Sequence, residues 1–307
     1  MLQQIMKWSC FLALISIGLV AGEGAWKHDH EYKYRFVYKT FLKEPTSKIL
    51  GFVSSVGLTI HPQTDRVLIG RITDASSKIL THDQTPDERD SVPTFVPIGK
   101  QFKFFLKNGV IDSLSVDRTL TTTEINRMKL IVSQFQVDTK AENVIESMNN
   151  HLPDANTNNA LYTTMETTVS GTCETSYDIS RLPEYLAYAN YGSIASLSRY
   201  AVGDDVIEIK KHINTKNCEE LTGTDFMDIV SKKNDRDSIV SRDTRIIITG
   251  SLDKYIIHSS EYYNQMLDIN NYVYLSLESL KRTNDNSDYT YGTQSDNMLN
   301  IGNLVYQ

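Results

Sequence analysis

Residues 121–136 read TTTEINRMKLIVSQFQ and carry the signals of an amphipathic helix. Four apolar residues recur at spacings of three, four and three: Ile125, Met128, Val132 and Phe135. This spacing places the four side chains on one face of an α-helix. Thr122 or Thr123 can cap the helix, and Glu124 in the first turn complements the helix dipole. We therefore expect one helix whose apolar face needs an apolar surface to cover.

Period-two patterns, which are typical of β-strands, dominate the chain on both sides of this helix. Over residues 32–39, YKYRFVYK, aromatic residues alternate with basic ones and with Val37. Asn108-Gly109 between two apolar runs is a strong signal for a tight hairpin. Further strand patterns lie at residues 52–60, 66–71, 101–114, 161–179, 207–210, 246–263 and 272–280. About ten strands and one helix predict a mainly β fold, a strongly curved sheet or large antiparallel β-barrel around one enclosed α-helix.

Several stretches interrupt the strand patterns. Residues 149–159, 231–245 and 284–295 are polar or charged and are expected to be loops. The segment Leu182–Tyr200, with four tyrosines among small residues, receives no assignment. The pattern over Leu161–Ile179 passes without a break through Ser170-Gly171-Thr172-Cys173, so we expect one long strand there and no nucleophile elbow.

The N-terminus resembles a secretory signal. Residues 9–22, SCFLALISIGLVAG, form an uncharged apolar run after Lys7, and small residues follow it. A membrane-spanning helix needs about 20 apolar residues, so this run is short for a span. We expect a signal peptide at residues 1–22 and a domain at residues 23–307, secreted and extracellular, with no membrane span in the mature chain. An uncleaved anchor is the alternative.

Cleavage would remove one of the three cysteines and leave Cys173 and Cys218. In an oxidising compartment, an even number of cysteines favours a disulfide, so we expect one bridge between them. Two unpaired thiols are the alternative. Two cysteines alone do not make a zinc site.

Charge and motifs exclude several function classes. The net charge of −7 supplies no basic surplus for neutralising phosphates, so no nucleic-acid partner is expected. The chain contains no glycine-rich phosphate loop, no Gly-x-Ser-x-Gly and no His-Glu-x-x-His. We expect no enzyme activity, no catalytic residues and no cofactor. His28 and His30 are a weak candidate for metal binding, because two ligands leave a site incomplete.

Lys33, Arg35 and Lys39 share one face of the first strand pattern. This basic face could bind an acidic receptor module or lipid headgroups. The alternative is that it is the solvated side of a half-buried strand.

Short segments spread over the mature chain resemble the N-terminal β-barrel domain of the large lipid transfer proteins, and among them the vitellogenins of invertebrates. Residues 169–177, VSGTCETSY, carry the most specific similarity. The other similar segments are Glu31–Tyr38, Phe104–Leu114, Glu124–Gln136, Lys211–Cys218 and Leu299–Gln307. The resemblance implies a barrel of the lipovitellin N-terminal type that encloses the helix, and it also implies the Cys173–Cys218 pairing. Relative to the family pattern, Leu182–Tyr200 looks like an insertion.

The resemblance implies a function in lipid transport or as a yolk nutrient reservoir and storage protein. Its implied partners are lipid and a cell-surface lipoprotein-type receptor, which the barrel would contact. The family's helical and lipid-cavity domains have no counterpart in these residues, so the chain is expected to be a vitellogenin-like fragment that does not hold bulk lipid by itself. The first alternative is a free-standing secreted recognition module without lipid cargo, and the second is a secreted hydrolase.

Overall fold

The computed structural model of the protein describes residues 26–42, 49–81, 96–154, 156–169, 171–183, 205–221, 239–267, 269–283 and 296–302. The expected signal peptide, residues 284–295 and nearly all of Leu182–Tyr200 lie outside the described residues. The described part contains thirteen strands and one helix: β1 (His30–Leu42), β2 (Ile49–Thr64), β3 (Val67–Thr81), β4 (Gln101–Lys107), β5 (Val110–Asp117), α1 (Thr122–Ser133), β6 (His151–Asp154), β7 (Asn159–Thr168), β8 (Gly171–Arg181), β9 (Val206–Leu221), β10 (Ile239–Ser251), β11 (Lys254–Met266), β12 (Ile269–Arg282) and β13 (Asp296–Leu299).

The strands join one sheet in the order β13-β5-β4-β3-β2-β1-β12-β11-β10-β9-β8-β7-β6, and neighbours pair antiparallel. Two pairings join strands that are far apart in the chain, β1 with β12 and β13 with β5. The first strand therefore lies in the middle of the sheet and connects its two arms.

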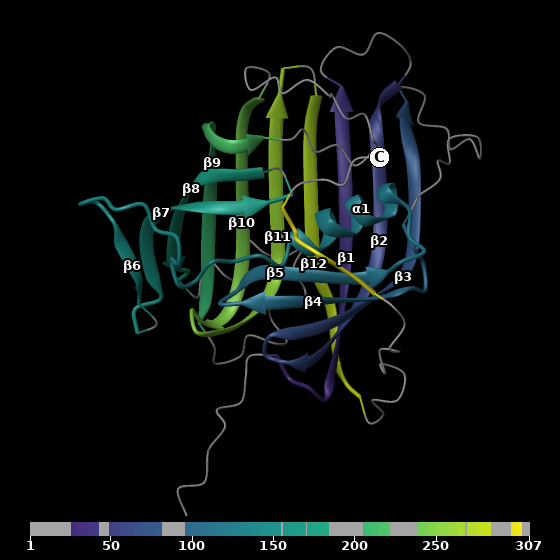
Figure 1. Cartoon of the computed structure of the whole chain (residues 1–307), viewed down its shortest axis with the longest axis horizontal. Coiled ribbons are helices and arrows are strands. Elements are labelled where there is room, and N and C mark those ends of the chain that lie inside the picture. The colour runs from purple at the N-terminus through teal and green to yellow at the C-terminus, as the bar shows by residue number, and fades with distance from the viewer. Residues whose placement is uncertain are drawn as a thin grey trace, which may run out of the picture.

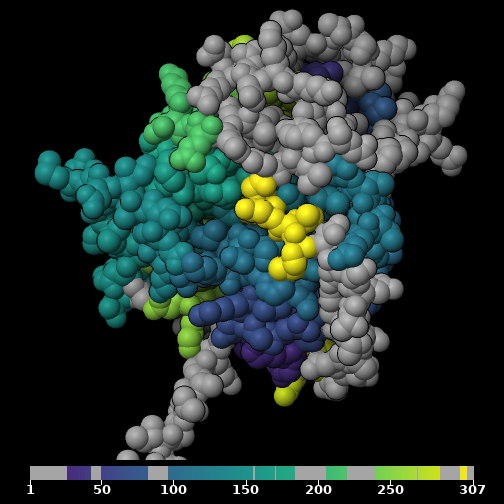
Figure 2. Space-filling view, viewed as in Figure 1, coloured from purple at the N-terminus to yellow at the C-terminus, as the bar shows by residue number. Residues whose placement is uncertain are grey.

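The sheet curves around the helix. Figure 1 shows the strands from β9 through β12 and β1 to β3 side by side as a wall, with α1 across its front and β4 and β5 in front of its lower half. Phe135, two residues after the end of α1, contacts Tyr34 on β1 and Phe104 on β4, so this segment lies between the wall and the front layer. In Figure 2, β13 lies on the front surface of the molecule.

The prediction of a mainly β fold with one helix and a large antiparallel sheet is confirmed. The strands at its two ends, β13 and β6, are not paired with each other in the described part of the chain. Within the described residues the sheet is therefore strongly curved but is not closed into a barrel by hydrogen bonds.

The N-cap of the helix lies one residue before Thr122 and two before Thr123, the two expected caps. Thr121 is the N-cap, and its Oγ1 accepts a hydrogen bond of 3.3 Å from the backbone N–H of Glu124. The Glu124 carboxylate in turn accepts a bond of 2.8 Å from the backbone N–H of Thr121. This capping box satisfies two of the donors that a helix start leaves unpaired.

Two predicted strands are wrong because each is a hairpin. The run over 161–179 turns between β7 and β8 next to Gly171, whose φ of +114° is accessible to glycine without strain. The run over 246–263 turns between β10 and β11 at Leu252-Asp253. In the first run, the odd-numbered positions face outward on β7, where Leu161 is exposed, and inward on β8, where Cys173 and Tyr177 are buried, so the alternation of the sequence continues across the turn and does not reveal it.

Two predicted loops contain strand. β6 lies within 149–159 and pairs with β7, and β10 begins at Ile239, within 231–245. Pairing with β11 makes Ile239–Arg245 a strand despite its charged residues, of which Asp243 is exposed and Arg242 is buried. Residues 222–238 lie outside the described part.

The expected bridge between Cys173 and Cys218 is present and joins register partners on β8 and β9. Next to it the register shifts, because Cys173 pairs with Cys218 whereas Glu174 pairs with Asn214. Three residues of β9, 215–217, therefore bulge out of the ladder. The Glu174 carboxylate accepts hydrogen bonds from the side-chain amides of Asn214 and Asn217 and so spans the bulge.

Candidate functional sites inside and outside the curved sheet

The helix is covered on more than its apolar face. All four residues of the predicted stripe are buried: Ile125, Met128, Val132 and Phe135. Arg127 and Lys129, which lie outside the stripe, are buried as well. Burial lowers the pKa of Lys129 below its usual value, because desolvation disfavours the ammonium ion. The helix is thus a component of the interior.

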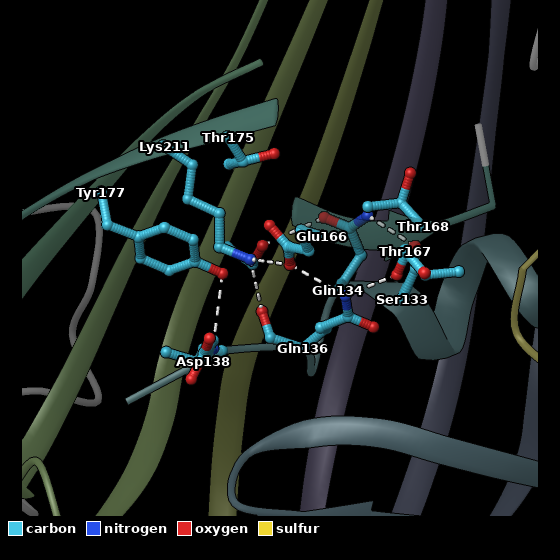
Figure 3. A network of polar contacts seen from close by, with 12 residues as sticks. Ser133, Gln134, Gln136, Asp138, Glu166, Thr167, Thr168, Thr175, Tyr177 and Lys211 are labelled. Atoms are coloured by element: carbon cyan, nitrogen blue, oxygen red, sulfur yellow. Dashed lines mark hydrogen bonds and ion pairs between the residues drawn. The ribbon is translucent and has the colours of Figure 1, made fainter. Parts of the chain in front are cut away.

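A buried ion pair anchors the segment that follows the helix. Lys211 Nζ on β9 lies 2.8 Å from Glu166 Oε1 on β7 and donates a bond of 2.9 Å to the backbone carbonyl of Gln136. Gln136 Nε2 donates to the same Glu166 oxygen at 2.8 Å and to the Thr167 carbonyl at 2.9 Å (Figure 3). The side chains of Lys211 and Glu166 are only 6% and 3% exposed, so neither charge has access to bulk water. These contacts connect the segment after the helix to strands β7 and β9.

Asp138 extends this network. Its carboxylate accepts hydrogen bonds from the backbone N–H groups of Lys140, Ala141 and Glu142, and its own N–H donates to the Tyr177 hydroxyl at 3.4 Å (Figure 3). Burial raises the pKa of Asp138 above its usual value, and the three N–H donors oppose that rise. Lys211 Nζ lies 4.9 Å from the centre of the Tyr177 ring. These contacts fix the turn that follows α1.

The cavity beside the network is small. It has a volume of about 40 Å³ and is lined by residues of α1, β7, β9, β10 and β11 and of the segments next to them, including Leu130, Gln134, Glu166, Lys211 and Tyr262. Drug-sized ligands occupy roughly 300–1,000 Å³. A space of this size does not hold a lipid load, and the network around it is suited to positioning chain segments.

The two histidines proposed as a metal pair have separate partners. His28 Nε2 lies 4.0 Å from Asp65, and His30 Nδ1 lies 2.6 Å from Asp29. The described residues contain no group of three or more histidine, cysteine, aspartate or glutamate side chains arranged to hold a metal ion. No described helix is long and apolar enough to cross a membrane.

The basic face of β1 is largely neutralised within the sheet. Arg35 forms ion pairs with Asp74 at 2.5 Å and Glu278 at 3.1 Å, and Lys33 lies 3.6 Å from Glu31. Lys39 has no carboxylate partner among the described residues, and its Nζ lies 5.8 Å from the centre of the Tyr272 ring. Arg35 and Lys33 thus have carboxylate partners within the chain, whereas Lys39 remains available for an external partner.

Tyr272 also lines an open groove of about 460 Å³ on the outer face of the part of the sheet formed by β7 to β12. Tyr263 and Leu161 supply exposed apolar surface along the groove. Charged residues cross it in one row of register partners from β8 to β11: Asp178, Lys210, Arg245 and Glu261. Lys39 thus lies next to a groove that combines aromatic, apolar and charged side chains.

Comparison with known families bears on this arrangement of a curled sheet, an enclosed helix and a β8–β9 disulfide. The family model described as the vitellogenin N-terminal domain matches residues 26–272 of the chain. The chain belongs to the vitellogenin N-terminal domain family.

Vitellogenin relatives are similar over nearly the whole chain. The vitellogenin of Anthonomus grandis is 29% identical over 97% of this chain, and vitellogenin-1 of Solenopsis invicta is 30% identical over 95% of it. The chain spans only 18% of the length of each relative. A solved structure of lipovitellin, addressing that protein's lipid–protein interactions, matches 92% of the chain with a TM-score of 0.57 and 16% identity. That similarity supports the fold.

Sequence reasoning missed Lys211 and Glu166, although a signal for both was present. In this vitellogenin domain Lys211 occurs in phase with the buried Ile209 and Ile213, and Glu166 occurs in phase with the buried Tyr162. A charged residue at an inward position of a strand predicts a buried partner of opposite charge. Which two residues pair could not be read from the sequence, because the pairing depends on the β7–β8 hairpin that the sequence reading did not find.

Proposed function

We propose that the chain is the N-terminal part of a secreted yolk and lipid-transport protein, in which the outer face of the sheet binds a cell-surface receptor of the lipoprotein type. The family assignment supports the lipid-transport role, and the observation that carries the binding role is the groove beside Lys39. An unpaired cation next to exposed aromatic and apolar surface suits a partner with acidic groups on an apolar module. Secretion follows from the expected signal peptide at residues 1–22.

Two glutamine variants on one strand test the binding role. The secreted chain is measured against immobilised acidic ligand-binding modules of an oocyte lipoprotein receptor, at two salt concentrations. Lys39→Gln should weaken binding by about tenfold, which corresponds to the loss of one interfacial charge contact of about 1.4 kcal/mol. Lys33→Gln is the matched control, because Lys33 already has Glu31 as a partner. Equal affinity of both variants and wild type would contradict the assignment of the groove.

Lipid carriage is tested separately, by organic extraction of the purified chain and a count of phospholipid per molecule. The cavity of about 40 Å³ supports the proposal that these residues do not hold bulk lipid themselves. Many phospholipid molecules per chain would contradict that view. No bulk lipid together with Lys39-dependent binding favours receptor recognition as the local role, with lipid held by other parts of the full-length protein. The same result is expected of a free-standing recognition module, and the two differ in whether the native protein carries further domains.

We propose no catalytic role for the chain. A screen of the purified protein with esterase and protease substrates tests this, and turnover that survives further purification would support a hydrolase instead.

A further inference from the structure

Four polar side chains form a buried row across the inner face of the sheet. Thr40 on β1 pairs in register with Asn271 on β12, Asn271 with Asn264 on β11, and Asn264 with Arg242 on β10. The strands are neighbours in the wall (Figure 1). All four side chains are buried. Buried polar groups cost free energy unless each finds a hydrogen-bond partner.

At the β1–β12 end of this row, the side-chain acceptor of Asn271 has hydrogen-bond partners. Asn271 Oδ1 accepts a bond of 3.0 Å from the Tyr38 hydroxyl and a bond of 2.9 Å from Thr40 Oγ1. These contacts explain why polar residues are tolerated at Thr40 and Asn271.

The other end is not satisfied. Arg242 is 0% exposed, and its Nε donates to Asn264 Oδ1 at 3.2 Å. Its Nη1 and Nη2 are both buried without a hydrogen-bond partner, and it forms no ion pair with a carboxylate of the described residues. A guanidinium group does not lose its proton in a protein, so Arg242 stays charged. A buried charge without a counter-charge is strongly unfavourable.

The unsatisfied groups around Arg242 are hydrogen-bond donors. Because Asn264 Oδ1 faces the guanidinium group, its other amide atom is Nδ2, and this atom is buried without a partner. The Tyr262 hydroxyl, on the same face two residues earlier in β11, is also buried without a partner. Such a set fits a ligand that carries only acceptors and a negative charge. The planar fork of a guanidinium group matches the oxygens of phosphate and carboxylate.

Space for a small ligand adjoins the row. The cavity of about 40 Å³ is lined by Tyr262 and Thr244, which are register partners in the row next to Arg242 and Asn264, and also by the Lys211–Glu166 ion pair. Arg242 and Asn264 themselves are not among its lining residues. A cavity of this size holds about three water molecules. That volume is compatible with a small oxyanion, and an acyl chain attached to the oxyanion would have to lie outside the cavity.

We propose that this inner-face row binds a small oxyanion, a phosphate or carboxylate group, through the two Nη atoms of Arg242, with Asn264 Nδ2 and the Tyr262 hydroxyl as further donors. The site lies inside the sheet, and the cavity beside it shares Lys211 and Thr244 with the lining of the receptor groove on the outer face.

Thermal unfolding of the dialysed protein in inorganic phosphate or acetate tests the site. Wild type should show a saturable rise in Tm of about 5 °C at a ligand concentration 100-fold above Kd. Arg242→Lys keeps the charge but removes the fork, and the rise should be much smaller. Arg245→Gln is the control from the same strand, because Arg245 pairs with Glu208 on the outer face, and it should keep the full rise.

A second variant keeps the test informative if changes at Arg242 prevent folding. Asn264→Asp places a carboxylate beside the guanidinium group, so it should raise Tm without ligand and abolish the response to phosphate. A lower Tm with an unchanged phosphate response would contradict the proposal.

Analysis of what co-purifies distinguishes the sources of the oxyanion. About one phosphorus per chain in the aqueous phase identifies free phosphate, and the same amount in the organic phase identifies a phospholipid headgroup. A fatty acid in the organic phase without phosphorus identifies a carboxylate. The absence of any co-purifying oxyanion, together with no ligand-dependent change in Tm, would overturn the proposal.

Discussion

The ring of Phe135 meets the ring of Tyr34 edge-on, with centroids 5.1 Å apart and an interplanar angle of 82°. Phe135 lies two residues after the end of the helix and Tyr34 belongs to the central strand, so the contact connects the helical segment to the middle of the sheet. Phe104 of the front layer lies 5.4 Å from the same Phe135 ring. One side chain therefore joins the wall, the helical segment and the front layer.

Phe135→Ala should lower the free energy of unfolding by about 3–5 kcal/mol, because it removes contacts on both sides of the ring and leaves a cavity. Urea unfolding followed by far-UV circular dichroism measures this value. Phe41→Ala is the matched control on β1, since Phe41 is 42% exposed, and it should change stability far less. Equal losses would show that Phe135 does not connect the layers.

Lys211→Met should destabilise the protein by about 3–5 kcal/mol, because it leaves the Glu166 carboxylate buried without a cation. The double variant Lys211→Met/Glu166→Met should be more stable than the sum of the single losses predicts, since both charges are then gone. A double-mutant cycle by chemical denaturation provides the measurement. Lys210→Met, at the exposed neighbouring position, should cost less than about 0.5 kcal/mol. Strict additivity of the two buried substitutions would contradict the ion pair.

Cys173→Ser should lower the free energy of unfolding by about 4 kcal/mol in the loop-entropy model, since the bridge closes a sequence separation of 45. Thermal scans with and without reductant measure the effect, and secretion yield should fall with it. Identical melting temperatures under both conditions would show that the bridge does not form in the secreted protein.

Protonation of His258 should contribute to acid destabilisation. The side chain is buried on β11, its Nε2 lies 2.8 Å from Thr249 Oγ1, and burial lowers its pKa from 6.5 to about 4. Between these pH values the unfolded chain binds a proton at this residue and the folded chain does not. The resulting stabilisation is therefore complete above pH 6.5 and is lost as the pH falls towards 4, by about 3 kcal/mol in total.

Replacement of His258 isolates its contribution from that of the carboxylates. Chemical denaturation of wild type and His258→Asn at several pH values from 7.5 to about 4 should show a shallower loss for the variant. His151→Asn, at an exposed position on β6, serves as the control and should follow wild type. Parallel curves for all three proteins would show that His258 titrates normally.

The sequence predicted those elements whose pattern is local. The apolar stripe of the helix follows from a spacing within 16 residues, and the alternation of Tyr32 to Tyr38 follows from a strand with one buried face. The two hairpins at Gly171 and Leu252 were missed because alternation continues across a tight turn. The bulge in β9 was missed because register is set by the partner strand as well as by the strand itself.

The candidate sites depended even more on strand pairing. Arg35 appeared as one of three equivalent cations, and only the positions of β3 and β12 beside β1 place Asp74 and Glu278 against it. The buried polar row that ends at Arg242 contains residues of four strands, β1, β12, β11 and β10. Arg242 itself lies in a stretch whose composition predicted a loop. A contact between strands hundreds of residues apart leaves no mark in either segment alone.

The bulge beside the disulfide has a consequence for how the protein is made. Two strands can form backbone hydrogen bonds in a shifted register, whereas a disulfide forms only when the register brings the two sulfur atoms into contact. Here they meet only after residues 215–217 have looped out. If the chain folds in an oxidising compartment, the disulfide would form only in molecules whose β8 and β9 pair in this register, and misaligned molecules would remain reduced and free to pair again.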